Sequence, residues 1–154
     1  MNRWFISAAS VIGAAIMLGG CGGGQYVISG RAVRSDFSTV SFVSGNDSRL
    51  GGDGVPSVEV YVYRDPDKPS RKLLARGLTD ADGYLTLTMD AFGAGWMDEQ
   101  WMIFTYRPGY QSATAWTALP PAKSGGQLLM LLGEGRAERP PPENELIDQY
   151  ERFK

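Results

Sequence analysis

The sequence predicts an all-β protein, an antiparallel β-sandwich of about seven strands followed by a short C-terminal helix. Apolar and polar residues alternate with a period of two, most clearly over residues 58–63. Turn residues separate these short stretches along the chain. The chain also has 20 glycines and 9 prolines, residues that disfavour helices. Together these patterns favour a sandwich over a helical fold.

Eight stretches have the composition of strands. Val58, Val60 and Val62 are expected on a buried face, with tyrosines on the opposite face of the same strand. Aspartate and glycine at Asp80–Gly83 predict a tight turn with a positive φ at Gly83, joining two strands as a hairpin. Residues 100–106 are apolar on both faces, which leaves their buried side open. The expected strands are residues 26–33, 39–43, 58–63, 72–78, 84–89, 100–106, 110–118 and 127–132.

The composition changes after Gly133. Residues 138–142 include three consecutive prolines, which predict a stiff extended spacer. Residues 143–154 have apolar side chains at helical spacing, so they predict a short amphipathic helix. Such a helix is marginal by itself, because isolated helices need about 12–15 residues. Its apolar stripe is expected to pack on the sandwich or on a partner protein.

The N-terminal segment has the layout of a secretory signal peptide. A basic start at Arg3 precedes an uncharged apolar stretch over residues 4–17, which is shorter than the ~20 residues that a membrane-spanning helix needs. Small residues then lead to Cys21, the only cysteine. The alternative is an ordinary signal peptide cut elsewhere, which would leave Cys21 as a free thiol in an exported protein.

Leu18-Gly19-Gly20-Cys21 resembles the lipobox of bacterial lipoproteins. The resemblance implies that Cys21 receives a diacylglyceryl group, that the chain is cut before it and that the new N-terminus is acylated. The cell envelope is then the expected location. The next residue is Gly22 and not the aspartate that retains enteric lipoproteins at the inner membrane, so the resemblance favours the outer membrane.

Composition excludes several kinds of chemistry. The chain has no histidine, the residue that most often serves as a general base or a metal ligand. From Cys21 onward, 14 basic side chains face 17 acidic ones, a balance without the basic character of nucleic-acid-binding proteins. We therefore expect no catalytic residues, no metal, no cofactor and no nucleic-acid partner.

Four short motifs occur in the order expected of a known family. They are Gly30–Val33, Gly54–Val60, Thr79–Leu85 and Pro108–Tyr110. Their order and spacing resemble the carboxypeptidase regulatory-like domain, a transthyretin-like (prealbumin-like) sandwich of seven strands. The resemblance covers residues 26–132 and implies a non-catalytic accessory or interaction module.

Two groups of residues are candidate ligand sites. Tyr61, Tyr63, Trp96 and Trp116 would suit a glycan if their rings were exposed side by side, although aromatic residues in sheets also pack against neighbouring strands. Asp80 and Asp82 resemble the start of a calcium loop, but the pattern ends after Gly83, so a turn is favoured.

The sequence thus predicts a membrane-anchored envelope lipoprotein with a non-catalytic structural or interaction domain. Its expected partners are the lipid bilayer, through acylated Cys21, and an envelope protein. The alternative is a module that binds carbohydrate or peptidoglycan through exposed aromatic side chains. The expected organisation is a signal peptide (1–20), a glycine-rich tether (21–25), the sandwich (26–133) and the spacer with its helix (134–154).

Overall fold

The computed structural model describes residues 25–68, 71–97 and 99–142. Within these residues the chain forms eight strands and one short 3-10 helix, which confirms the all-β prediction. The predicted C-terminal helix lies outside the described residues. The elements are β1 (Gln25–Arg34), β2 (Thr39–Ser44), η1 (Ser48–Gly51), β3 (Glu59–Arg64), β4 (Lys72–Leu78), β5 (Tyr84–Asp90), β6 (Trp101–Tyr106), β7 (Thr114–Thr117) and β8 (Gly126–Leu132).

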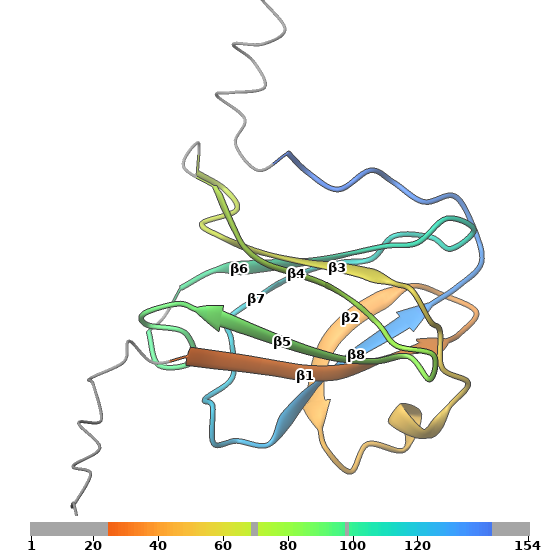
Figure 1. The fold of residues 1–154 in the computed structure, drawn as a ribbon, viewed down its shortest axis with the longest axis horizontal. Helices are drawn as coiled ribbons and strands as arrows, with labels where there is room; N and C mark the ends of the chain where they lie inside the picture. The colour runs from red at the N-terminus through yellow and green to blue at the C-terminus, as the bar shows by residue number, and fades with distance from the viewer. Residues whose placement is uncertain (1–24, 69–70, 98, 143–154) are drawn as a thin grey trace, which may run out of the picture.

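Two four-stranded sheets face each other as a sandwich (Figure 1). The first sheet has the order β2-β8-β1-β5, and the second has the order β4-β3-β6-β7. Neighbouring strands are antiparallel except for β1 and β8, which run parallel. The prediction of antiparallel pairing therefore holds for every pair but this one.

The valines of β3 and the one directly before it lie in the core, as predicted. Val58, Val60 and Val62 have no exposed surface. They belong to one cluster with apolar side chains from both sheets, among them Ile28 of β1 and Leu87 of β5. A period-two pattern thus placed one face of β3 correctly, because alternate residues of a strand point to opposite faces.

The predicted hairpin between residues 72–78 and 84–89 is wrong. Strand β4 pairs with β3 in the second sheet, whereas β5 pairs with β1 in the first, so the Asp80–Gly83 turn crosses between the sheets. Thr79 explains the crossing. Its backbone N–H donates to the carbonyl of Val58 at 3.0 Å, and its buried hydroxyl donates to the carbonyl of Val55 at 2.9 Å. These bonds hold the end of β4 against the β3 side.

The turn itself has the predicted geometry. Gly83 has a φ of 83°, which confirms the predicted positive value. Asp80 Oδ1 accepts hydrogen bonds from the backbone N–H groups of Asp82 and Tyr84, at 3.0 and 2.8 Å. The carbonyl of Gly83 accepts from Ala32 N–H at 2.8 Å, which attaches the start of β5 to β1. Both ends of the turn are therefore fixed, each to a different sheet.

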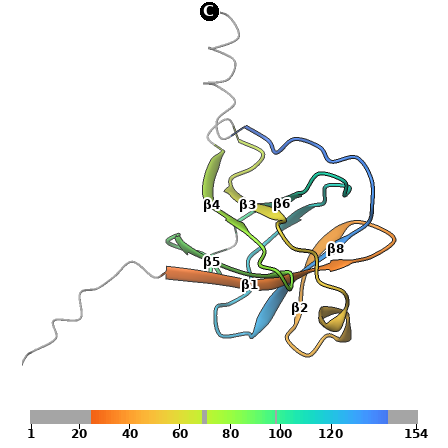
Figure 2. The ribbon, with the colours of Figure 1, turned by 45° about the vertical axis from the view of Figure 1, so that its right-hand side comes forward.

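The outer face of the second sheet carries a second apolar cluster. Its buried members are Tyr61, Tyr63, Met102 and Phe104. Strand β6 is thus buried on both sides, which answers the question that its uniformly apolar sequence leaves open. Along this face runs an extended segment, residues 134–142, which we call the strap (Figures 1 and 2).

Hydrogen bonds attach the strap to the sandwich along its length. Gly135 N–H donates to the carbonyl of Gly109 at 3.1 Å. Ser112 Oγ accepts from Glu138 N–H at 3.0 Å and donates to the Glu138 carbonyl at 3.2 Å. The Tyr63 hydroxyl donates to the Pro141 carbonyl at 2.7 Å. The proline-rich segment therefore lies on the domain.

Strand β7 is shorter than predicted. Residues 110–118 were expected to form one strand, but the ladder with β6 covers only Thr114–Thr117. The reason is that Tyr110 pairs with Glu134, and Gln111 N–H donates to the carbonyl of Gly133 at 2.9 Å. No helix in the described parts of the chain is long and apolar enough to cross a bilayer.

Candidate functional site

Cys21 precedes the first described residue, Gln25, by four positions. Its predicted acylation therefore concerns residues outside the described part of the chain. Strand β1 begins at Gln25 itself. Whatever is attached at Cys21 is thus separated from the folded domain by three glycines.

Three of the four predicted ligand-surface residues share the outer face of the second sheet. The strand register places Tyr63 opposite Met102, and Met102 opposite Trp116. Tyr61 lies next to Tyr63, with ring centroids 6.3 Å apart and an interplanar angle of 15°. Trp96 lies elsewhere, in the connection between β5 and β6.

Exposure separates these four side chains further. Tyr61 and Tyr63 have only 7% and 1% of their surface exposed, whereas Trp116 has 55% and Trp96 has 69%. A sugar ring stacks on the open face of an aromatic side chain, so the two tyrosines offer little to such a ligand. Of the four, only Trp96 and Trp116 have rings open to solvent.

Polar contacts around Tyr61 join β3 to β4. The Tyr61 hydroxyl donates to Glu59 Oε2, and Arg76 Nη2 donates to the same oxygen at 2.5 Å. Burial and the hydrogen bond to Glu59 raise the pKa of Tyr61 to about 12. The hydrogen bond from Tyr61, supported by Arg76, lowers the pKa of Glu59. Both pKa values are moved away from neutrality, so these groups are not suited to exchange protons at neutral pH.

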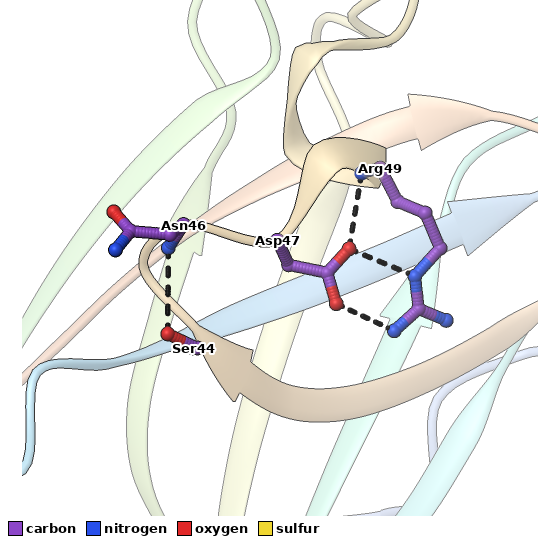
Figure 3. Close-up of polar contacts among 4 residues, drawn as sticks. All are labelled: Ser44, Asn46, Asp47 and Arg49. Atoms are coloured by element: carbon purple, nitrogen blue, oxygen red, sulfur yellow. Dashed lines mark hydrogen bonds and ion pairs between the residues drawn. The ribbon is translucent and has the colours of Figure 1, made fainter.

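Like Asp80 in its turn, the acidic residue Asp47 takes part in local structure. Asp47 caps η1 by accepting from Arg49 N–H at 3.0 Å, and it pairs with the Arg49 guanidinium at 2.9 and 2.7 Å (Figure 3). These hydrogen bonds lower the pKa of Asp47 to about 2. Nearby, Ser44 Oγ accepts from Asn46 N–H at 3.5 Å. Within residues 25–68, 71–97 and 99–142, no three metal-ligating side chains lie together.

A polar hollow of about 520 Å³ lies beside the end of β1 and the start of the strap. Arg34 is its main cation. It contacts Glu134 at 3.6 Å and donates to the Tyr110 hydroxyl at 3.1 Å. Both Arg34 and Glu134 are more than half exposed, so solvent screens this pair.

Sequence reasoning named Trp96 as a candidate but missed its exposed partner, Phe92. Phe92 and Trp96 are each 69% exposed, and their rings meet edge to face with centroids 5.4 Å apart. They belong to the connection 91–97, where a turn closes through Met97 N–H donating to the Gly93 carbonyl at 2.9 Å. The sequence indicated only an irregular stretch here, although glycines spaced between aromatic residues were a usable signal.

Contacts with the start of β1 fix this aromatic loop. Gly95 has a φ of 78°, and a Cβ there would lie 2.7 Å from the Tyr26 ring. The Tyr26 hydroxyl in turn donates to the Pro120 carbonyl at 2.5 Å. Burial raises the pKa of this phenol. Together these segments line a hollow of about 270 Å³, formed by Gln25, Tyr26, Ala91, Phe92, Gly93, Ala94, Trp96 and Ala122.

Comparisons with known proteins give little information about this chain. It matches no protein-family model and no curated protein. A solved structure to which it is similar is the 9R-lipoxygenase from Cyanothece PCC8801, with 16% identity and a TM-score of 0.36. The match covers 73% of this chain and 14% of the lipoxygenase. A likeness of this size supports no conclusion about activity.

Proposed function

We propose that this chain is a bacterial lipoprotein of the cell envelope, anchored by acylated Cys21, whose β-sandwich is a non-catalytic structural or interaction module. The observation that carries the proposal is Leu18-Gly19-Gly20-Cys21 at the end of an uncharged apolar stretch. Attachment of several acyl chains would make the anchor durable, because each buried methylene contributes about 0.8 kcal/mol.

The arrangement of the domain supports the non-catalytic part of the proposal. The polar side chains with displaced pKa values, such as Glu59 and Asp47, are engaged in contacts that hold strands or turns. Their pKa values are displaced further from neutrality. The order of motifs that resembles the carboxypeptidase regulatory-like domain suggests the same role. The absence of aspartate after Cys21 favours the outer membrane as the location.

Replacement of the cysteine tests this proposal. In Cys21→Ser, the thiol that would carry the diacylglyceryl group is gone. We expect the variant to lose incorporation of radiolabelled palmitate and to leave the membrane fraction, or to accumulate as an uncut precursor. Ser7→Ala, inside the proposed signal peptide, is the control that should behave as wild type. A Cys21→Ser chain of mature size that stays in the membrane fraction would contradict the proposal.

Glycan binding is the second candidate, favoured by the exposed ring of Trp116 on the strand β7. One aromatic ring can stack on one sugar. A pull-down with peptidoglycan and with soluble polysaccharides separates the candidates. Binding that is lost in Trp116→Ala would favour the glycan module, and no retention on any glycan would favour the structural module.

A further inference from the structure

The end of the sandwich where β1 begins carries an exposed apolar group. Phe92 and Trp96 are 69% exposed, more than the other large apolar side chains of the described residues, and Met97 beside them is 40% exposed. The edge-to-face contact between the two rings keeps them together. Exposure of this kind costs free energy in water and commonly marks a contact surface.

This aromatic loop lies beside the point where the chain enters the domain. Gln25 pairs with Asp90, the last residue of β5, directly before the loop. Gln25 also lines the same hollow as Phe92 and Trp96. Figures 1 and 2 show β1 beginning next to the connection that follows β5. Since Tyr26 contacts both this loop and Pro120, the loop cannot move far from the start of β1.

The length of the tether limits how far this end can lie from the membrane. Four residue steps separate Cys21 from Gln25. An extended chain advances at most ~3.6 Å per residue, so Gln25 lies within about 14 Å of the sulfur-bearing residue. If Cys21 sits at the bilayer surface, the tether is short enough for the loop next to Gln25 to reach the lipid headgroups.

We propose that Phe92 and Trp96 insert into the headgroup region of the bilayer that holds acylated Cys21, so that the domain docks on the membrane in one orientation. The inference rests on the lipid anchor proposed above. Tryptophan favours this region of a membrane, where its ring contacts acyl chains and its N–H contacts water. Phe92 adds apolar area to the same contact.

The charges near the loop indicate which lipid it contacts. Asp90 precedes the loop, and Lys123 lies in the neighbouring connection that contains Pro120. Both side chains are exposed and opposite in sign, so the segments that flank the loop carry no excess of positive charge to attract anionic lipid. The contact is therefore with the apolar part of the bilayer interface, and zwitterionic lipid suffices for it.

Fluorescence quenching by brominated lipid tests the insertion. The full acylated protein, extracted from membranes, is reconstituted in phosphatidylcholine vesicles with bromine on the upper part of the acyl chains. After removal of the signal peptide three tryptophans remain, at positions 96, 101 and 116. Trp101 is buried at 1% exposure, and Trp116 lies on the outer face of the second sheet, opposite Met102. Only Trp96 is expected to reach the bromines.

We expect brominated lipid to quench the wild-type protein and Trp116→Phe, and to quench Trp96→Phe several-fold less. Phe92→Ser should reduce the quenching of Trp96, because it removes half of the inserted group. Melting curves of the variants verify that each is folded. Equal quenching of wild type and Trp96→Phe would overturn the proposal, as would quenching that disappears in Trp116→Phe.

The remaining outcomes are also decisive. The fluorescence of Trp96 could instead change only when the vesicles hold much protein, and equally with brominated and unbrominated lipid. In that case a second copy of the chain covers the loop, and the proposal is wrong. The proposal would also be overturned if added glycan shifted the emission wavelength of Trp96 while brominated lipid did not quench it. If the protein is acylated but brominated lipid does not quench it, insertion of the loop is rejected and the lipid anchor stands. If the protein carries no acyl groups, the lipid anchor and the inserted loop are both rejected.

Discussion

Val60 lies in the core of the sandwich, near the start of β3, with no exposed surface. Its neighbours in the core come from both sheets and are apolar. In Val60→Asp a carboxylate would be buried without a partner, which costs several kcal/mol. Since a domain of this size has only about 5–15 kcal/mol of stability, we expect the variant to be largely unfolded.

Circular dichroism melting measures this prediction. Glu59→Gln is a useful comparison, because Glu59 precedes Val60 on the opposite face, where its side chain is 24% exposed and keeps an oxygen that can accept from Tyr61 and Arg76 after the change. It should melt much closer to wild type. A Val60→Asp variant that melts within a few degrees of wild type would mean that the register of β3 is wrong.

Substitutions at Gly83 and Gly109 separate the strain of a positive φ from the steric clash of an added side chain. Both have a positive φ, 83° and 87°. A Cβ at Gly83 would lie 2.4 Å from the Ala32 carbonyl oxygen, whereas a Cβ at Gly109 meets nothing within 4 Å. Gly109→Ala therefore adds only the strain of the left-handed region, about 1 kcal/mol. Gly83→Ala adds the same strain and must also push β1 away from the turn.

Chemical denaturation of the two variants tests this difference. We expect Gly83→Ala to lose at least about 1 kcal/mol more of the free energy of unfolding than Gly109→Ala, because backbone atoms must shift. Equal losses would show that the turn has room for a side chain, in conflict with its position against Ala32.

At the scale of whole elements, the strap is hydrogen-bonded to the outer face of the second sheet. Its bonds to Ser112 and Tyr63 hold residues 136–142 along the outer face of the second sheet. Two truncations isolate its contribution. A chain that ends after Gly135 loses both contacts, whereas a chain that ends after Pro142 keeps them.

We expect the shorter chain to melt several degrees below the longer one, as for the loss of about 1 kcal/mol. The shorter chain should nevertheless remain folded, because β8 ends at Leu132. Identical melting temperatures would mean that the strap contributes nothing to stability. Complete unfolding of the shorter chain would make the strap part of the core.

The elements also show how far sequence reasoning reaches in this protein. The alternation of valines in β3 predicted its buried face, and aspartate before glycine predicted the turn at Gly83. Neither pattern carries information about which strand pairs with which. A turn with aspartate before glycine can join two strands of a hairpin or two strands of different sheets. Here the second outcome depends on the hydrogen bond from Thr79 to Val55, a residue distant in sequence.

The candidate site was less predictable than the fold. Tyr61 and Tyr63 are buried because they belong to an apolar cluster on the outer face and because the strap lies over that face. The alternation of residues in one strand predicts only that this face is exposed to solvent. Phe92 and Trp96 contact each other because the loop turns back at Gly93 and Gly95, which both have a positive φ. Local propensity could not place them next to Gln25.

At the scale of the whole molecule, we propose a sandwich held close to a bilayer by acylated Cys21, with one end facing the lipid. Only three residues lie between Cys21 and Gln25, which limits the distance between the anchor and the domain. The aromatic loop at the start of β1 would then fix the orientation of the domain. The strap and the exposed ring of Trp116, on the other layer of the sandwich, remain available to an envelope partner.

The most direct test of the central claim is the mass of the N-terminal peptide from protein extracted from bacterial membranes. Trypsin cuts after Arg31, the first basic residue beyond Cys21, so the expected peptide is Cys21–Arg31. We expect this peptide to begin at Cys21 and to carry the added mass of a diacylglyceryl group and of an acyl group on its amine. A peptide that begins at another residue, with an unmodified thiol at Cys21, would contradict the proposed lipid anchor.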